Sequence, residues 1–416
     1  MAASRNGSGS PKCHSLSRHH LVRLSDTLHE TLARTPYNPP EGASISIKSL
    51  LESLLPSSDA SSTKESRREI NDFFLCCAAL AAAEGDESPA LYWIPRDLCL
   101  LAKSALKEMA GAASYGSEGD MIVEMVPEIL PEVKRVIKES CVDTEEEEFL
   151  AASAKAPVEK AVVAGHQLRW MVSQVCYPKL GNLCWLVIPC ALTALDHWSP
   201  EVKEQGMASF VHVSKNVTAT ELSWYEEAIL DACCRNIPAS DELWYRVVEV
   251  SVLLLTCTQR NNPRSLWFEQ MLNEMLGHLE RQPYNKERRI AWLTLIEPIF
   301  NAMGLLILAH FRRLFPLFLQ WMHADDDKTI ILVLERLGTI VQLTWVRQSP
   351  YTERLVDELI LLYKESATRR NREVLRDHIL QMLTILQKCK GLQFESAWDK
   401  HKNDPDLLML LSSHKL

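Results

Sequence analysis

A helix–turn–helix pattern that occurs twice constrains the fold of this chain more than any other feature. The first copy has Pro189 in an apolar helix, a turn around Trp198, and a second amphipathic helix from Val202. The second copy has the same order, with Pro316 in its first helix and an acidic turn at 325–327. The two prolines lie 127 residues apart, close to three times 42. A fixed period in this range is typical of stacked helical pairs rather than of a closed globule.

Turns recur at a similar spacing through the second half of the chain. The intervals between their centres are 41, 45, 42 and 42 residues, and the turns centre near Ser199, Ser240, Asn285, Asp327 and Arg369. The second helices are expected to begin at Val202, Trp244, Ile290, Ile330 and Val374, with a kink at Pro298 in the third. One hairpin cannot bury its apolar face alone, so neighbouring hairpins cover one another. The sequence therefore predicts an all-α solenoid of stacked antiparallel helix pairs.

The remainder of the chain is less regular. Residues 1–17 are rich in Ser and Gly and are expected to form a disordered tail. Residues 18–140 read as an irregular helical region, whose last helix contains Pro127 and Pro131 and should be kinked or split. We expect about five repeats over residues 149–395 and a C-terminal cap or tail at 396–416.

Composition restricts the class of protein. The 416 residues are 47% hydrophobic and 24% charged, as in ordinary folded proteins, and the net charge of −9 argues against a general nucleic-acid binder. The first ten residues hold no apolar signal segment, and most of the 12 cysteines lie in apolar helical stretches. We therefore expect buried free thiols and a cytosolic protein, a nuclear one, or both. Apolar runs such as 248–257 are too short to span a membrane.

Motifs for catalysis and for metal binding are missing from the sequence. It contains no GxSxG, no phosphate-binding glycine loop, no HExxH and no CxxC. The acidic turn at 325–327 lacks the glycine and the following glutamate of a calcium loop, so we interpret its aspartates as helix caps. We predict no catalytic residue, metal or cofactor, and thus no enzyme. An enzyme with an unrecognised site stays an alternative.

Basic and aromatic residues near the turns are candidates for partner binding. A solvated surface is the alternative interpretation for the arginines, and core packing is the alternative for the tryptophans. Arginine and tryptophan nevertheless contribute much of the binding energy of protein interfaces. The candidate arginines are Arg288, Arg289, Arg369, Arg370, Arg372 and Arg376.

The first helix pair resembles a HEAT repeat. Proline in the first helix, an aspartate in the turn, and Val202-Lys203 early in the second helix follow the usual pattern of that family. The second copy keeps Pro316 and Asp325 but has Thr329-Ile330 instead of the valine and the basic residue. The resemblance to the armadillo/HEAT superfamily extends over about residues 150–390.

A narrower resemblance begins at Tyr177-Pro178 and continues through Asp196-His197-Trp198 to Asn216-Val217. This block is similar to the Tti subunits of the Tel–Tti co-chaperone complex, and the chain also resembles plant armadillo-type proteins of unassigned function. The Tti resemblance implies a scaffold that helps chaperone machinery to mature phosphatidylinositol-3-kinase-related kinases. It also implies that residues 165–220, with Tyr177, Pro178 and Trp198, help to bind another HEAT-repeat subunit. An importin-like transport adaptor is the alternative, although the sequence lacks a regular Asn ladder.

Overall fold

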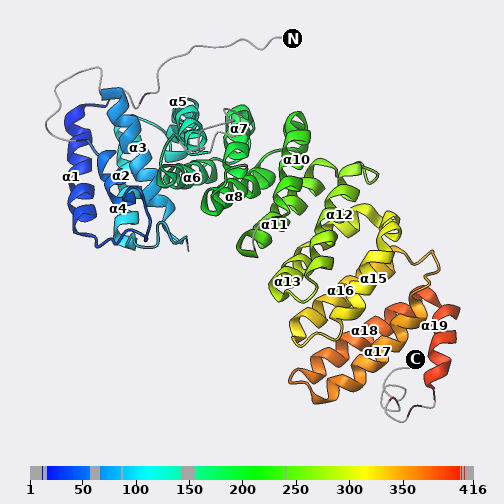
Figure 1. Cartoon of the computed structure of the whole chain (residues 1–416). Coiled ribbons are helices and arrows are strands. Elements are labelled where there is room, and N and C mark those ends of the chain that lie inside the picture. The colour runs from blue at the N-terminus through cyan, green and yellow to red at the C-terminus, as the bar shows by residue number, and fades with distance from the viewer. Residues whose placement is uncertain are drawn as a thin grey trace, which may run out of the picture. The chain divides into compact units, whose positions relative to one another are not determined.

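Helices make up the regular structure of the chain. The computed structural model describes residues 12, 16–56, 66–85, 88–141, 155–238, 241–402, 404 and 407, and these contain α and 3-10 helices but no strand. The predicted all-α class is confirmed. Most of the expected tail at 1–17, the turn at Ser240 and part of the expected cap at 396–416 lie outside the described residues. The chain divides into two compact units, Met1–Ala232 (unit 1) and Cys233–Leu416 (unit 2). Figure 1 labels their helices.

Unit 1 begins with five helices. Ser17 and Ser46 cap the first two, each accepting a hydrogen bond from a backbone N–H in the first turn. The last of the five runs through Pro127 and Pro131 without a break, so the helix is not split at these prolines. Both prolines lie on its exposed side, where water can hydrate the carbonyls that lose a partner. The five are α1 (Arg18–Arg34), α2 (Ile47–Ser53), α3 (Ser66–Ala82), α4 (Arg96–Ala112) and α5 (Glu118–Glu139).

Stacked helix pairs follow in unit 1. Helix α5 packs against α7 and α6 packs against α8, so one hairpin lies on the next, and α3 packs against α6. The stacked pairs thus begin with α5, whereas the sequence predicts that the repeats start at residue 149. The elements are α6 (Val158–Ser173), η2 (Gly181–Leu183), α7 (Cys184–Leu195), α8 (Pro200–Asn216), α9 (Ala219–Leu222) and η3 (Ser223–Tyr225); α10 (Glu226–Asn236) crosses the boundary between the units.

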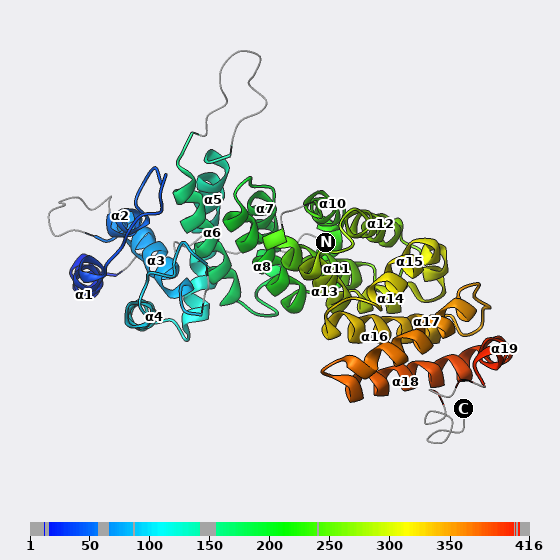
Figure 2. The same cartoon turned by 60° about the horizontal axis from the view of Figure 1, so that its bottom comes forward.

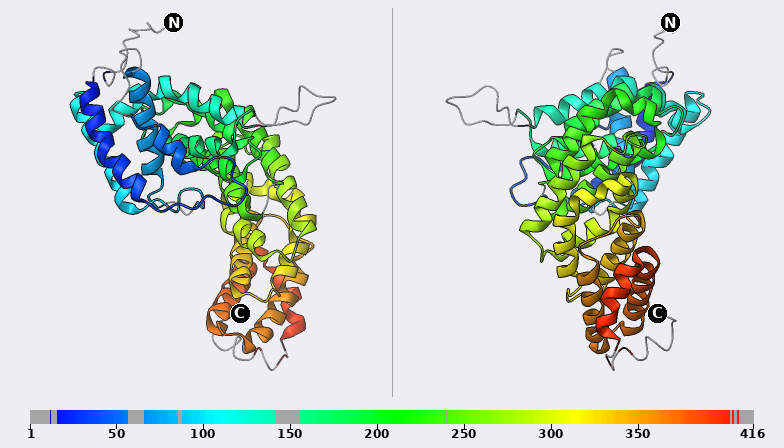
Figure 3. Two further views of the ribbon diagram at one scale, coloured as in Figure 1. Left: turned by 60° about the vertical axis from the view of Figure 1, so that its left-hand side comes forward. Right: turned by 90° about the vertical axis from the view of Figure 1, so that its right-hand side faces the viewer.

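Unit 2 consists of two layers of helices, which the left view of Figure 3 shows side by side. One layer contains the second helices of the repeats, α11, α13 with α14, α16 and α18, each packed on the next. The other contains the first helices α12, α15, α17 and α19. Figure 2 shows α17, α18 and α19, the last helices of unit 2, from another direction. The bounds are α11 (Asp241–Thr258), α12 (Leu266–Arg281), α13 (Lys286–Leu295), α14 (Glu297–Met303), η4 (Gly304–His310), α15 (Phe311–Trp321), α16 (Asp327–Leu343), α17 (Thr352–Glu365), η5 (Ser366–Thr368), α18 (Arg372–Lys390), α19 (Leu392–Trp398) and η6 (Asp399–His401).

The antiparallel pairing gives unit 2 two opposite edges. Turns within a repeat lie at one edge, which we call the turn edge, and comprise residues 282–285, 322–326 and 366–371. Links between one repeat and the next lie at the other, which we call the link edge. They comprise residues 259–265, 304–310, 344–351 and 391.

Large aromatic side chains fill the core of unit 2. Trp292 lies within 6.2 Å, centroid to centroid, of the Phe300, Phe318 and Trp321 rings, and all four side chains are buried. The buried indole of Trp321 donates a hydrogen bond to the carbonyl of Pro283 (2.8 Å), in the preceding turn. The kink expected at Pro298 takes the form of a break, because α13 ends at Leu295 and α14 begins at Glu297 with the proline in its first turn.

One segment of unit 2 corrects the expectation that no stretch is long and apolar enough to span a membrane. By length and composition, Glu297–Trp321 passes that test. Arg312 and Arg313 interrupt its apolar run, which is why runs of apolar residues alone did not reveal it. The segment comprises α14, η4 and α15, and its large side chains, including Phe300 and Phe318, are buried in the repeat core. Core helices of soluble proteins pass the same test.

Candidate protein-binding surfaces

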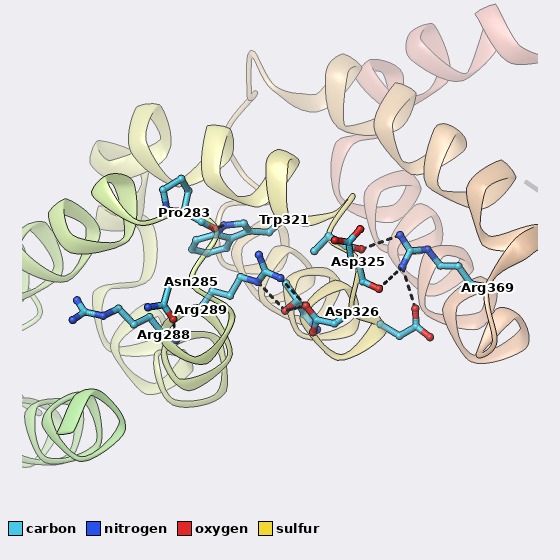
Figure 4. Close-up of polar contacts among 11 residues, drawn as sticks. Pro283, Asn285, Arg288, Arg289, Trp321, Asp325, Asp326 and Arg369 are labelled. Carbon is cyan, nitrogen blue, oxygen red and sulfur yellow. Dashed lines mark hydrogen bonds and ion pairs between the residues drawn. The ribbon is translucent and has the colours of Figure 1, made fainter. Parts of the chain in front are cut away.

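Arg289 joins two successive turns of unit 2. Its Nη2 donates to Asp326 Oδ2 (2.7 Å) and its Nε donates to Thr329 Oγ1 (3.1 Å), across the gap between α13 and α16. Asp326 is also the N-cap of α16 and accepts from the Thr329 backbone N–H (2.9 Å). Burial raises the pKa of Asp326, but the hydrogen bonds from Thr329 and Arg289 outweigh it, so the pKa is lowered overall. The capping interpretation of this acidic turn is confirmed. Figure 4 shows the contact.

Arg288 is engaged in the same way with the preceding repeat. Its Nε donates to Asp241 Oδ1 at the start of α11, and its guanidinium lies 4.8 Å from the Trp244 ring centroid. The Trp244 indole donates to the carbonyl of Arg288 (3.0 Å). The hydrogen bond from Arg288 lowers the pKa of the Asp241 carboxyl. Arg288 and Arg289 are 6% and 8% exposed, so neither offers a guanidinium surface to a partner.

Arg369 repeats this arrangement one turn further along the chain. Its Nη2 donates to the carbonyl of Ala324 (2.9 Å), and its Nη1 contacts the Asp325 carbonyl (3.3 Å) and Asp327 Oδ1 (3.2 Å). Figure 4 shows the side chain reaching back to this turn. The three arginines therefore connect repeat to repeat, a role that sequence reasoning missed because their partners lie 37 to 47 residues away.

The other three candidate arginines differ in exposure. Arg376 Nε donates to Ser366 Oγ (3.2 Å), and its guanidinium lies 4.5 Å from the Tyr363 ring centroid, which fixes the side chain against α17. Arg372 is exposed and pairs with the adjacent Glu373 (2.7 Å). Arg370 is exposed and has no ion pair within the described part of the chain. A role in partner binding stays a prediction for Arg370 and Arg372.

Tyr177 and Pro178 lie in the link that enters α7 of unit 1. The Tyr177 side chain is 62% exposed, and the peptide bond between the two residues is cis. The link is anchored on its inner side, where His212 Nε2 lies 2.9 Å from the Val175 carbonyl oxygen. Trp198 lies at the turn between α7 and α8, at the other end of a 12-residue helix. About 18 Å of helix therefore separates the two sites, which do not form one surface.

Trp198 is held by a buried polar network. Its indole donates to the Ser140 carbonyl (3.0 Å), and its ring stacks on His197 while 54% of the residue stays exposed. His197 Nδ1 accepts from the Ser199 backbone N–H (3.0 Å), so Nε2 carries the proton and donates to Ser140 Oγ (2.8 Å). Burial, followed by the charge of Lys203, lowers the pKa of His197 to about 4. The turn thus presents a rigid, half-exposed indole beside a neutral imidazole.

Two exposed tryptophans of unit 1 were not among the predicted site residues. Trp185, in the first turn of α7, is 61% exposed, and Trp224, in η3, is 86% exposed. Both lie at the link side of the repeats, as does Tyr177. The chemistry of this surface is aromatic and suits protein contact. Trp224 and Trp244 both lie near helix starts, yet only Trp244 is buried, so this position in the sequence does not reveal exposure.

Two grooves lie on the second-helix face of the described part of unit 2. The first, of about 450 Å³, lies along α11 and α13 and includes Tyr245, Ile290 and Thr294, with Glu287 at its rim. The second, of about 290 Å³, lies between α16 and α18. In it the buried Arg336 pairs with Glu297 and with Glu335 (3.1 Å), and His378 Nε2 lies 3.9 Å from Glu335. These grooves can accept apolar and basic side chains of a peptide.

The described residues contain no group of three or more His, Cys, Asp or Glu side chains that could hold a metal ion. Burial raises the pKa of the thiols of Cys76 and Cys77, which makes both poor nucleophiles. The exposed aromatic side chains described above suit contact with other proteins.

Comparison with known proteins shows the family to which the chain belongs. No family model matches its sequence. It is 50% identical over 402 residues to the uncharacterized protein At2g39910 of Arabidopsis thaliana, a match that covers 93% of this chain and 92% of that protein. The chain belongs to the family of that protein. This agrees with the predicted resemblance to plant proteins of unassigned function.

Two more distant matches bear on fold and function. Human TELO2-interacting protein 2 is 24% identical over 245 residues, which cover 54% of this chain and 48% of that protein. This supports the predicted Tti resemblance. A structure of Kap95p with RanGDP aligns with 94% of this chain and 42% of its own, at 12% identity and a TM-score of 0.50. Kap95p is yeast importin-β. The shared fold is the HEAT-repeat solenoid, and the chain spans less than half the length of either protein.

Proposed function

We propose that this chain is a non-enzymatic protein-binding scaffold, and that it serves as a co-chaperone subunit of the Tel–Tti type. The observation that carries the proposal is the similarity to TELO2-interacting protein 2 over 245 residues, on a HEAT-repeat fold. The name of that protein states that it binds TELO2. By analogy, this chain would bind a HEAT-repeat subunit and help to mature phosphatidylinositol-3-kinase-related kinases.

The surfaces of unit 1 support this proposal. The link side offers the exposed aromatic rings of Tyr177, Trp185 and Trp224, which can bury a large area at a low cost in conformational entropy. The turn side offers Trp198, whose ring is held in place by its hydrogen bond to Ser140. A stack of hairpins keeps these side chains at fixed spacings, as a binding surface requires.

The proposed location is the cytoplasm, with the nucleus as a further compartment. The described cysteines support a reducing environment, because all of them are free thiols and most are buried.

Depletion of the protein tests the co-chaperone role. We expect the steady-state levels of phosphatidylinositol-3-kinase-related kinases to fall while their messenger RNA levels stay constant, because the kinases would fail to mature. An unrelated protein kinase serves as the control. Unchanged levels of all these kinases after complete depletion would remove the co-chaperone role and leave only the general scaffold.

A transport adaptor of the importin type is the second candidate. The exposed carboxylate of Glu287 at the first groove favours it, because it suits a basic cargo segment, whereas Glu297 and Glu335 at the second groove are paired with Arg336. Binding of a lysine-rich peptide to the purified chain, weakened by Glu287→Gln, would support this function. Failure to bind such a peptide at low salt would reject it.

A further inference from the structure

The link edge of unit 2 exposes apolar side chains at every link. A soluble surface normally keeps such side chains scattered, whereas here they recur from one repeat to the next. Two of them, Leu266 and Leu392, are 77% and 82% exposed, and Trp345 is 63% exposed. The set consists of Leu266, Leu305, Leu306, Trp345, Val346 and Leu392.

The same edge carries positive charge without nearby negative charge in the sequence. The chain has no Asp or Glu within residues 250–268, 298–324, 336–352 and 378–394, and each of these stretches contains one link. Five exposed cations in these stretches form no ion pair with any described residue. They are Arg260, Arg264, Arg312, Arg347 and Lys388.

Contacts between successive links join the last part of this edge into one surface. Lys390 Nζ donates to the carbonyls of Thr344 (2.8 Å) and Arg347 (2.7 Å), and the Ser349 backbone N–H donates to Gln393 Oε1 (3.3 Å). One link earlier, the Tyr351 ring stacks on Phe315 at 4.4 Å, and η4 packs against α16. Figure 1 shows the links of unit 2 on the right-hand side of the stack.

The turn edge differs from the link edge in its acidic residues. It contains Asp325, Asp326 and Asp327, and the arginines that lie there are largely used within the chain, as Arg289 and Arg369 show. Exposed cations without an ion pair to a described residue also lie at the turn edge, with the exposed Tyr284 beside two of them. The link edge is distinguished by exposed apolar side chains at every link, within stretches that contain no Asp or Glu. A complementary partner must combine carboxylates with apolar side chains.

We propose that the link edge of unit 2 binds an acidic amphipathic helix of a partner protein. Neighbouring helices in a layer are about 10 Å apart, and seven residues of an α-helix rise about 10.5 Å. A partner helix with an apolar residue at every seventh position can thus place one at each link, and its carboxylates can reach Arg260, Arg264, Arg347 and Lys388. The inference deepens the proposed scaffold function, on which it rests, by giving the chemistry of one partner.

A designed peptide tests the proposal on the full-length chain. The probe is a fluorescein-labelled 21-residue helix with leucine at heptad positions a and d and glutamate at most others. A second peptide has the same composition in scrambled order. We expect fluorescence anisotropy in 50 mM salt to show binding of the amphipathic peptide, at least about tenfold tighter than that of the scrambled one. Raising the salt to 500 mM should weaken the binding, because the exposed charges are screened.

Two charge-reversal variants locate the site. The link variant carries Arg260→Glu, Arg264→Glu, Arg347→Glu and Lys388→Glu. The matched control carries Arg281→Glu, Lys286→Glu, Lys328→Glu and Arg370→Glu, which are also exposed and without an ion pair among the described residues. We expect the link variant to weaken binding about tenfold or more, and the control less than about threefold. Trp345→Ala alone should weaken it severalfold while the circular dichroism spectrum stays that of the wild type.

Three results would overturn the inference. They are absence of peptide binding, equal losses in both variants, and a link edge that binds phosphatidylserine vesicles but not the peptide. If the chain still binds a HEAT-repeat subunit when one of these results is found, the inference fails but the proposed scaffold function stands. Peptide binding at the link edge without any effect of depletion on kinase levels would remove the co-chaperone role alone.

Discussion

Arginine placement shows how strongly the surroundings of a single residue decide its role. Arg288 and Arg289 are adjacent in sequence, yet each reaches a different neighbouring repeat, and both are buried. Arg347 and Arg264 have the same chemistry but lie at the link edge, exposed and without a carboxylate partner in the described structure. The sequence identified the arginines near turns as interesting but could not separate these two roles.

The buried imidazole of His197 predicts a specific pH dependence of stability. Its pKa is about 4 in the folded protein and near 6.5 when the chain is unfolded, so the unfolded state binds the proton more tightly. The contribution of neutral His197 to the free energy of unfolding is fully present above about pH 6.5 and is lost as the pH falls towards 4. It amounts to at most about 3 kcal/mol. Thermal unfolding from pH 7.5 to 4 should show a steeper loss for the wild type than for His197→Gln.

An exposed histidine provides the control for that comparison. His19→Gln should follow the wild-type pH curve, because the His19 side chain is exposed and makes no hydrogen bond or ion pair with any described residue. Parallel curves for the wild type and His197→Gln would show that His197 does not titrate differently in the folded and unfolded states.

Close helix packing in unit 1 depends on one glycine. A Cβ atom at Gly206 of α8 would lie 2.9 Å from the Leu195 backbone nitrogen and 3.1 Å from the Ala191 carbonyl oxygen. Since backbone cannot yield as a flexible side chain can, Gly206→Ala should destabilise the fold by about 1–3 kcal/mol. Gly111→Ala in α4 is the matched control, because nothing lies within 4 Å of the added atom, and it should stabilise by up to about 1 kcal/mol. Urea denaturation of both variants measures the difference, and equal effects would contradict the packing argument.

The contact between successive turns of unit 2 should contribute strongly to stability. Arg289→Ala leaves the partly buried Asp326 with only its capping bonds, so unfolding of unit 2 should become easier by about 3 kcal/mol. Arg370→Ala, at an exposed position, should change stability by less than about 0.5 kcal/mol. A double-mutant cycle with Asp326→Asn measures the coupling. Additive effects of the two substitutions would show that the pair contributes nothing of its own.

Helix positions were more predictable than contacts. The expected second-helix starts at Val202, Ile290 and Val374 lie within four residues of the observed starts of α8, α13 and α18. Helical periodicity and turn residues are local signals, so the sequence carries them directly. Contacts with the neighbouring repeat, about 40 residues away in the sequence, decide whether Trp185 and Trp224 are exposed. The same contacts decide which partners the arginines find. The four acid-free stretches of unit 2, in contrast, are visible in the sequence and were not recognised as an edge.

At the scale of the whole molecule, a repeat stack should respond locally to local damage. Each helix pair mainly contacts its neighbours, so stability is close to a sum over repeats and their interfaces. Hydrogen exchange of Arg289→Ala, followed by mass spectrometry, should show faster exchange in α13 and α16 and unchanged exchange in α3 and α6. Uniformly faster exchange in both units would mean that the chain unfolds as one cooperative body.

The native mass of the endogenous protein tests the scaffold claim most directly. Mass photometry of the gently purified, tagged chain, followed by mass spectrometry of its components, should give a complex well above the 47.2 kDa of the monomer. We expect that complex to contain a second HEAT-repeat subunit. A protein that is recovered at 47.2 kDa, with no partner enriched over a control purification, would contradict the account.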